Sequence, residues 1–541
     1  MKQYLPLLIS FIAMSCSEPT QVDCIVKGKI YTVDEKSTMA EAVAINDGKI
    51  LAVGSSKKIA EEYEAENLMD FGDKPVYPGF YDAHCHFLGY GLTLQEASLV
   101  GTSSIDEVVE RLKAFSTDHP EAEWITGRGW DQNDWSVKEF PDFKVLDEAF
   151  PDKPVYLVRI DGHAAWVNSA AIKLAKVTAN TKVEGGDILS NNDGTPKGIL
   201  IDKAMQLVAD KIPAAGIEKK TKALLEAQQN CFSVGLTTVS DAGLPYEDIK
   251  LIDSLHRDGQ LLMNMYVMLT PTRVTIENLI DKGPFITDKL TVRSIKLYSD
   301  GALGSRGAYL VKPYHDDPHN HGLRLLNQEE LMNMAQKAYE NDYQLNVHCI
   351  GDAANKFVLK AMAEVLKPEN DNRWRIEHAQ IVQPEDVSTY KQYNIIPSVQ
   401  PTHATSDMYW AEQRLGPDRI KTAYAYQELL DAVGLLAIGS DFPVEDINPL
   451  LGFHAAVARQ DVKGYPDEGF QTENAISRED ALKGMTIWAA FANFEERKRG
   501  SIEPGKHADF TVLEEDIMTV SLEKIPEVKV AATIVNGEQV Y

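Results

Sequence analysis

The chain contains 541 residues, of which 44% are hydrophobic and 25% are charged, and these fractions are typical of a globular protein. They exclude a disordered, collagen-like or low-complexity chain, and the length suits one large domain or two to three smaller ones. Acidic residues outnumber basic ones by 81 to 54, which gives a formal net charge of −27. Because nucleic-acid binding depends on Lys and Arg neutralising phosphates, we expect no nucleic-acid partner.

The N-terminal segment predicts export. An apolar stretch over residues 5–14 follows the basic residue Lys2, and Ser15-Cys16 comes directly after it. A short apolar run between a basic and a small residue is typical of a secretory signal peptide. The run is too short to favour a retained transmembrane helix.

The pair Ser15-Cys16 resembles the lipobox of bacterial lipoproteins. The resemblance implies that residues 1–15 are removed and that Cys16 becomes the acylated first residue of the mature chain. Such a protein is exported to the bacterial periplasm or outer membrane, and it contacts the membrane only through its lipid anchor. The alternative is an ordinary cleaved signal with an incidental cysteine.

Both ends of the chain show β-strand patterning. Apolar and polar residues alternate over residues 22–53, and again over residues 508–513 and 530–537. A period of two indicates strands, and Asp47-Gly48 marks a turn between two of them. We predict that residues 22–77 and 492–541 meet in one small β-sandwich domain.

Between these ends, short apolar runs alternate with amphipathic helical stretches, a pattern typical of βα units around a parallel sheet. We therefore predict an α/β protein whose catalytic domain, residues 78–491, is a (β/α)8 barrel. The eight predicted strands cover residues 76–82, 236–240, 262–269, 292–298, 344–349, 374–378, 395–399 and 435–440. The long gap after the first strand, about residues 87–229, predicts an insertion that shapes the substrate pocket.

Side chains that can bind metal ions stand at the ends of these predicted strands, where barrel enzymes carry their functional residues. On an extended strand His84 and His86 project to the same side and can reach one ion, although such a pair alone is a weak signal. The full series is stronger. It consists of His84 and His86 after the first strand, Lys296 in the fourth, His348 and His378 ending the fifth and sixth, and Asp441 after the eighth.

Residues 78–86, with the sequence Pro-Gly-Phe-Tyr-Asp-Ala-His-Cys-His, resemble the opening motif of the amidohydrolase superfamily. Further segments resemble the branch of that superfamily, amidohydrolase family 3, that includes YtcJ-like proteins and N-substituted formamide deformylases. These segments are residues 127–131, 161–168, 300–308 and 346–352. The resemblance covers nearly everything after residue 22, and it implies the same barrel.

The resemblance implies a set of metal ligands. His84, His86 and Asp441 hold one divalent ion, and His348 and His378 hold a second. Zinc suits imidazole and carboxylate ligands. Lys296 bridges the two ions only as a carbamate formed with CO₂, because an ammonium group has no lone pair for a metal. The alternative is an unmodified Lys296 paired with Asp300 or another acid, and a single ion.

The implied reaction is hydrolysis of a non-peptide C–N bond, in an amide, N-formyl or cyclic amide, by a metal-activated hydroxide. The expected partner is thus a small-molecule amide, and barrels of this family often pair as homodimers. Asp441 serves as general base and then general acid, the alternative being a ligand role alone. His403, after the seventh strand, donates to the oxyanion or is simply structural.

We also expect several residues in the insertion and in the loop after the fourth strand to contact substrate. Arg306 either pairs with a substrate carboxylate or anchors its own loop by hydrogen bonds. The predicted substrate-binding residues are Trp130, Asp131, Asp161, His163, Ser305 and Arg306.

Two other functions compete with amide hydrolysis. An esterase or a deaminase could use the same ions. A lipoprotein that binds a small molecule without turnover would keep only the barrel, but a pure binder has no need for six metal-competent residues in barrel order.

Overall fold

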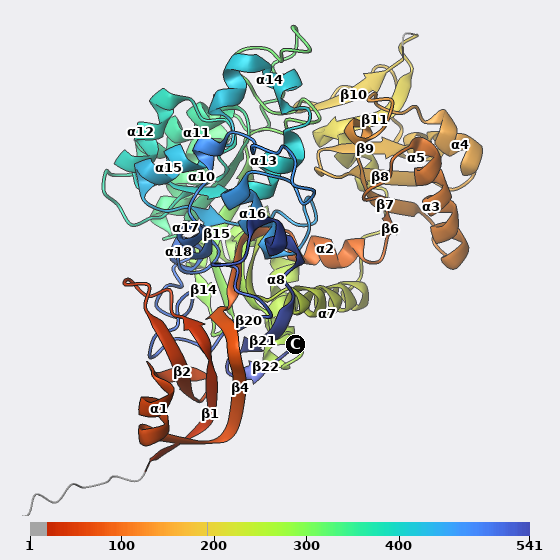
Figure 1. The fold of residues 1–541 in the computed structure, drawn as a ribbon. Helices are drawn as coiled ribbons and strands as arrows, with labels where there is room; N and C mark the ends of the chain where they lie inside the picture. Colours follow the sequence, from red (N-terminus) through yellow and green to blue (C-terminus); the bar gives the residue numbers. More distant parts are fainter. Residues whose placement is uncertain (1–18, 192) are drawn as a thin grey trace, which may run out of the picture.

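The computed structural model describes residues 19–191 and 193–541, which form a central barrel, a domain beside it and a β-domain built from both chain ends (Figure 1). The predicted signal segment, residues 1–15, and Cys16 lie outside the described residues. In the part of the chain that is described, no helix is both long and apolar enough to cross a membrane.

Eight parallel strands form the barrel, and each pairs with the next one along the chain. They are β5 (Phe80–Cys85), β12 (Leu236–Leu244), β13 (Asn264–Leu269), β15 (Leu290–Tyr298), β16 (Gln344–Cys349), β17 (Arg375–His378), β18 (Ile396–Val399) and β19 (Ala437–Ile438). The short strand β14 (Phe285–Ile286) pairs with β15 only. The predicted (β/α)8 barrel is confirmed.

The first predicted strand, residues 76–82, straddles two observed strands. The chain leaves the β-domain at the end of β4 (Tyr63–Pro78) and enters the barrel in β5. Gly79 separates the two, and a side chain there would collide with Thr237, since a Cβ would lie 2.2 Å from the Thr237 hydroxyl oxygen. The apolar run is therefore continuous in sequence but divided between two sheets.

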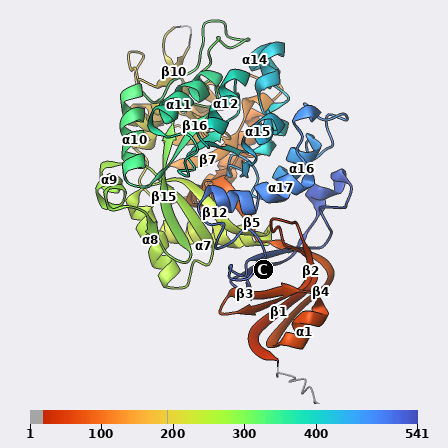
Figure 2. The same ribbon diagram turned by 90° about the vertical axis from the view of Figure 1, so that its left-hand side faces the viewer.

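Helices cover the outside of the barrel, each burying one apolar face against the strands. In α10, Leu331, Ala335 and Ala338 form that face, and the capping box of Asn327 and Glu330 begins the helix. The barrel helices visible in Figure 2 include α7 (Ile217–Ser233), α8 (Tyr246–Arg257), α9 (Arg273–Asn278), α10 (Gln328–Glu340), α11 (Asp352–Val365), α12 (Pro384–Gln392), α15 (Tyr426–Val433), α16 (Pro449–Ala458) and α17 (Arg478–Gly484). Further helices are α13 (Pro401–Asp407), α14 (Ala411–Arg419) and α18 (Ile487–Ala492).

An inserted domain follows β5 and α2 (Phe87–Thr93) and stands beside the barrel (Figure 1). Its sheet has the strand order β10-β11-β9-β8-β7-β6. The strands are β6 (Ala97–Ser98), β7 (Ile125–Trp130), β8 (Val155–Arg159), β9 (Ala164–Val167), β10 (Gly186–Ser190) and β11 (Pro196–Asp202), with helices α3 (Ile105–Asp118), α4 (Lys144–Ala149), α5 (Ser169–Ala175) and α6 (Gln206–Ala209). Most of α7 falls within the predicted insertion, yet its buried residues belong to the barrel core, so the inserted domain ends before it.

Strands from both chain ends form one sheet, in the order β22-β21-β20-β4-β1-β2-β3. Strand β4 joins the two halves, because it pairs in parallel with β1 and antiparallel with β20. Val26 and Val43 from one half share a core with Phe510 and Ile534 from the other, so the continuous sheet folds over onto itself. The remaining elements are β1 (Thr20–Tyr31), β2 (Met39–Asn46), β3 (Lys49–Gly54), α1 (Ser56–Glu62), β20 (Phe510–Leu513), β21 (Val530–Val535) and β22 (Glu538–Gln539).

Helix α2 begins directly after His86 and packs closely against α7. The contact requires a glycine at position 91, because a Cβ there would lie 2.1 Å from the carbonyl oxygen of Ala223. The other glycine at the centre of α2, Gly89, has more space, since a Cβ there would lie 3.4 Å from its nearest neighbour. The two glycines therefore differ in packing although they share one helix.

We expect Gly91→Ala to lower the free energy of unfolding by about 1–3 kcal/mol, because the two helices must separate to admit a methyl group. Gly89→Ala is the matched control and should leave stability unchanged or raise it slightly, since Ala favours helix over Gly. Thermal denaturation followed by circular dichroism measures both. Equal melting temperatures for the two variants would contradict the close α2–α7 packing.

Candidate metal centre

A cavity of about 550 Å³ lies at the carboxyl ends of the barrel strands. The barrel contributes its metal-competent residues to the floor, and the inserted domain contributes one wall. His86, Lys296, His348, His378 and Asp441 all line it. His84 is fully buried just beneath, and its Nε2 atom lies 3.4 Å from Asp441 Oδ1. The six residues predicted as metal ligands thus come together.

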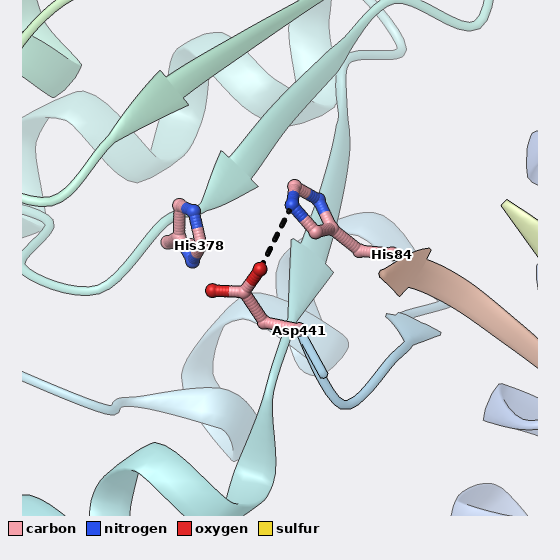
Figure 3. Close-up of side chains that lie close together, drawn as sticks. All are labelled: His84, His378 and Asp441. Atoms are coloured by element: carbon pink, nitrogen blue, oxygen red, sulfur yellow. Dashed lines mark ion pairs between the residues drawn. The ribbon is translucent and has the colours of Figure 1, made fainter. Parts of the chain in front are cut away.

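Three of these residues form a compact group in Figure 3. His84, His378 and Asp441 each offer one ligand atom, and these atoms all lie within 4.8 Å of one another. His86 joins them, with its Nε2 atom 3.2 Å from Asp441 Oδ1. A set of imidazole nitrogens around one carboxylate oxygen is typical of a zinc-type site.

His348 stands beside His378, and their ring centroids are 4.5 Å apart. Burial, together with nearby positive charge, lowers the pKa of both imidazoles well below the ordinary value for histidine. Both rings are therefore neutral near pH 7, and a neutral imidazole keeps a lone pair for a metal ion.

Lys296 lies in the same cavity without an acidic partner. Its Nζ atom is 3.2 Å from His84 Nε2, and no carboxylate among the described residues lies within ion-pair distance. The alternative pairing with Asp300 is not found, because that carboxylate accepts backbone N–H groups of Tyr309, Ile350 and Gly351 instead. Burial lowers the pKa of Lys296 to about 8, although Glu377 and Asp441 oppose that shift.

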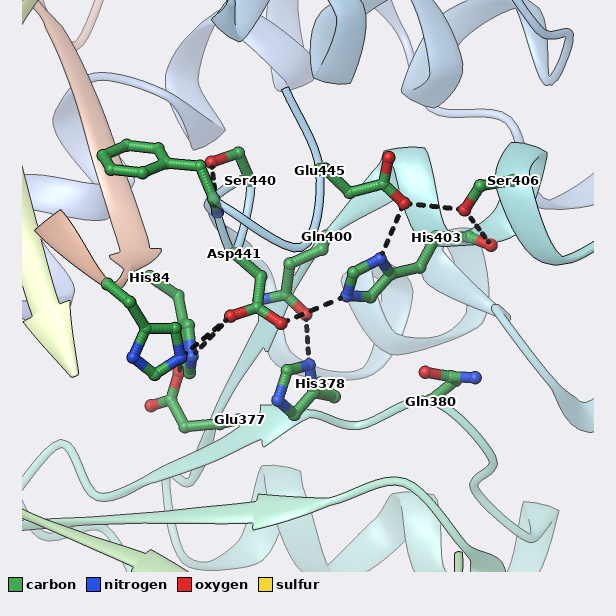
Figure 4. Close-up of polar contacts among 12 residues, drawn as sticks. His84, Glu377, His378, Gln380, Gln400, His403, Ser406, Ser440, Asp441 and Glu445 are labelled. Atoms are coloured by element: carbon green, nitrogen blue, oxygen red, sulfur yellow. Dashed lines mark hydrogen bonds and ion pairs between the residues drawn. The ribbon is translucent and has the colours of Figure 1, made fainter. Parts of the chain in front are cut away.

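Two buried side chains that sequence analysis missed orient the histidines (Figure 4). Glu377 accepts a hydrogen bond from His84 Nδ1 at 2.5 Å, and Gln400 Oε1 lies 2.7 Å from His378 Nδ1. Each contact turns the other ring nitrogen toward the cavity. Glu377 directly precedes His378, and Gln400 directly follows the seventh predicted strand. These two positions were the signals by which the sequence could have identified them.

Two of the predicted ligands have left-handed backbone conformations. The φ angle is +73° at His378 and +64° at Asp441. Residues other than glycine rarely adopt this region, which costs about 1–2 kcal/mol per residue. Such strain is typical of functional positions that the surrounding structure holds in place.

His403 lies across Asp441 from His84 (Figure 4). Its Nε2 atom is 3.5 Å from Asp441 Oδ2, and its Nδ1 atom is 3.1 Å from Glu445 Oε1. Burial alone would lower the pKa of His403, but the two carboxylates outweigh it and raise the pKa to about 10. The ring is therefore a cation and a hydrogen-bond donor at neutral pH.

The residues present fit a divalent metal ion. His348 Nε2 and Asp441 Oδ1 are buried and make no hydrogen bond among the described residues. The nearest polar atoms to Asp441 Oδ1 are the imidazole nitrogens of His84 and His86, at 3.4 and 3.2 Å. Burying a polar atom without a hydrogen bond costs free energy, and a cation held by these side chains would offset that cost. Burial would raise the pKa of Asp441, but the surrounding histidines hold it well below its ordinary value, so it is an anion.

The predicted substrate contacts divide into two groups. Asp131, Asp161 and His163 line the cavity. His163 Nδ1 lies 2.6 Å from Asp202 Oδ1, and its ring stands 5.2 Å from that of His348. These three residues can reach a bound molecule.

The other three predicted contacts are not among the residues that line the cavity. Trp130 packs in the core of the inserted domain and donates to the Leu157 carbonyl, because its strand turns this face inward. Ser305 is buried and its hydroxyl faces the Ala302 carbonyl. Arg306 pairs with Asp316 at 2.9 Å, as expected of a loop anchor. None of the three lines the cavity, and their contact with substrate stays a prediction.

Similar proteins place this geometry in a family. YtcJ of Bacillus subtilis (strain 168) is 32% identical over 95% of this chain and 98% of its own. The N-substituted formamide deformylase of Arthrobacter pascens is 26% identical over 95% of this chain and 97% of its own. The crystal structure of an uncharacterized metal-dependent hydrolase from Pyrococcus horikoshii OT3 superposes with a TM-score of 0.75 at 28% identity, covering 92% of this chain and 99% of the other.

The family model described as amidohydrolase family matches residues 67–541. That span contains the whole barrel, the inserted domain and every residue of the candidate metal centre. The chain belongs to the amidohydrolase family.

Proposed function

We propose that this protein hydrolyses a non-peptide C–N bond in a small molecule, such as an amide, an N-formyl group or a cyclic amide. The observation that carries the proposal is the convergence of His84, His86, His348, His378, Asp441 and Lys296 at the floor of one cavity. The relative named N-substituted formamide deformylase supports the choice of an amide bond over an ester.

The proposed metal is zinc, which suits imidazole and carboxylate ligands. His84, His86 and Asp441 would hold one ion, and His348 and His378 a second. Lys296 would lie between them as a carbamate, a role supported by its burial without an acidic partner. The bound ions would supply Lewis acidity and lower the pKa of water.

Asp441 is the proposed proton carrier. Its carboxylate would accept a proton from the attacking water and pass it to the leaving nitrogen as the C–N bond breaks. The water oxygen then ends in the product carboxylate, and the amine leaves with the proton. The contact between Asp441 and the metal-binding histidines supports this role, because it places the base where water is activated.

His403 is the proposed donor to the oxyanion. Glu445 holds its Nδ1 side, so the Nε2 proton points toward Asp441 and the cavity. A fixed cationic donor in a water-poor site stabilises negative charge that develops on the carbonyl oxygen. Ser406 also hydrogen-bonds Glu445, at 2.6 Å, and so limits movement of that carboxylate.

The two competing functions make different demands on the site. An esterase or a deaminase would use the same ligands, so only a substrate screen separates them from an amidase. A binding protein without turnover would tolerate loss of Asp441 as a base. The metal-loaded protein should therefore be assayed against N-acyl, N-formyl and cyclic amides, each beside its ester analogue.

Asp441→Asn should lower kcat for the best amide by at least about 10³-fold, because it removes the proton carrier. Turnover assays and metal analysis by mass spectrometry should be run together. Asp446→Asn, the same exchange in an exposed position of the same loop, is the matched control and should keep full activity. Unchanged turnover of every amide by the Asp441 variant at constant metal content would overturn the proposed base.

Glu377→Gln should weaken metal binding by about 10- to 100-fold, because His84 loses the carboxylate that orients it. Competition dialysis against a chelator measures this affinity. Glu495→Gln is the control, since Glu495 is another buried carboxylate beside an arginine, but it contacts Tyr81 and Thr291 instead of a proposed metal ligand. If both variants retained metal equally, the role assigned to Glu377 would be wrong.

Lys296→Met should reduce the metal content from about two ions per chain to one or fewer. The unmodified enzyme, incubated with ¹³C-bicarbonate, should also show a carbamate carbon by NMR that the variant lacks. Lys289→Met, near the opposite end of the same strand, should change neither result. One ion per chain and no carbamate signal in the unmodified enzyme would overturn the two-ion proposal.

A further inference from the structure

The charged groups of the cavity wall are mostly paired with one another. Arg159 is fully buried and binds both Asp131 and Asp161, the first at 2.6 Å. Glu445 binds His403 and Ser406. These groups neutralise each other and leave little attraction for a charged ligand.

Arg128 is the exception among the arginines that line the cavity. Its side chain makes one hydrogen bond among the described residues, from Nη2 to the Ile160 carbonyl at 2.9 Å. Its Nε atom is buried without a partner. No carboxylate of the described chain lies within ion-pair distance of the guanidinium. Burial lowers the pKa of Arg128, and the carboxylates of Asp161 and Asp441 oppose that shift only in part.

The inserted domain holds this guanidinium in place. Arg128 lies on β7, and the turn at Gly162, where φ is +76°, passes directly against its charged end. A Cβ at Gly162 would lie 3.4 Å from Nη2, so the turn covers one side of the guanidinium. An arginine cannot lose its proton in this setting, and its fork of N–H donors matches a carboxylate.

We propose that Arg128 binds a carboxylate of the substrate, and that the enzyme therefore acts on small amides that carry one. The inference rests on the proposed amide hydrolysis. Ile160, Leu303 and Trp410 line the same cavity and offer apolar surface. N-acylated apolar amino acids combine an amide, an apolar group and a carboxylate, and they are the substrate class that the cavity fits.

The test compares acids with carboxamides of the same shape. N-acetylleucine and N-acetylphenylalanine are titrated into the metal-loaded protein beside their carboxamides, by isothermal calorimetry. Where a probe is turned over, its kcat/KM replaces the dissociation constant. The unmodified protein should prefer each acid, and Arg128→Gln should reduce that preference by about 10- to 100-fold, because a hydrogen bond between charged groups is lost. Binding of the carboxamides should not change.

Arg111→Gln is the matched control. Arg111 belongs to the same domain and also donates to backbone carbonyls, but it pairs with Glu107 and does not line the cavity. Arg128→Lys keeps a charge without the fork, so it should retain part of the preference even if the glutamine variant folds poorly. Melting curves report folding in each case.

The outcomes separate this inference from the proposed function. No preference for any acid in the unmodified protein would overturn the Arg128 proposal. A preference that persists in Arg128→Gln would also overturn it, because the carboxylate would then bind elsewhere, for example at the metal ions. A preference that depends on Arg128, without hydrolysis of any amide, would support the anion site and refute the proposed function.

Discussion

The candidate metal centre depends on the seam at which the barrel closes. Asp441 donates its backbone N–H to the His84 carbonyl at 2.7 Å, and His86 donates to the Phe442 carbonyl at 2.8 Å. Asp82 strengthens the seam, because its carboxylate accepts the backbone N–H of His84 and the N–H and hydroxyl of Ser440. Burial raises the pKa of Asp82 to about 6, and these hydrogen bonds limit that rise. The hydrogen bonds that close the barrel therefore also position His84, His86 and Asp441, the first and last of the predicted metal ligands.

The charged groups inside the barrel keep each predicted metal ligand in the protonation state that a metal ion requires. Arg375 is fully buried and binds Glu377, which in turn fixes the tautomer of His84. Burying an isolated charge is costly, so the buried carboxylate of Glu377 needs the contacts it makes with the Arg375 guanidinium and the His84 imidazole. The same burial keeps His348 and His378 neutral. The site is thus prepared for cations before any ion is bound.

The barrel and the convergence of the predicted ligands could be predicted from the sequence because both follow from regular geometry. Parallel strands meet at one edge, so residues that end separate strands, such as His348 and His378, are brought together whatever lies between them. The direction in which a side chain of the inserted domain points follows no such rule. Alternation along β7 places Trp130 and Arg128 on the same side in sequence, but the glycine between them has φ of +109°, and the strand register shifts there. The tryptophan is buried in the domain core, whereas the arginine lines the cavity. Partners such as Glu377 were missed because a buried carboxylate has no sequence signature apart from its neighbours.

Catalysis and selectivity are therefore assigned to different parts of the chain. The barrel supplies the proposed metal ligands from strands whose ends are fixed by hydrogen bonds around the ring. The inserted domain supplies Arg128, Arg159 and His163, none of which belongs to a barrel strand. Because Arg159 is neutralised by two carboxylates, it stiffens the wall, and Arg128 alone among the cavity arginines is left to attract an anion. A change of substrate would then require changes in the inserted sheet and its loops, while the proposed proton carrier Asp441 and the histidines beside it stay the same.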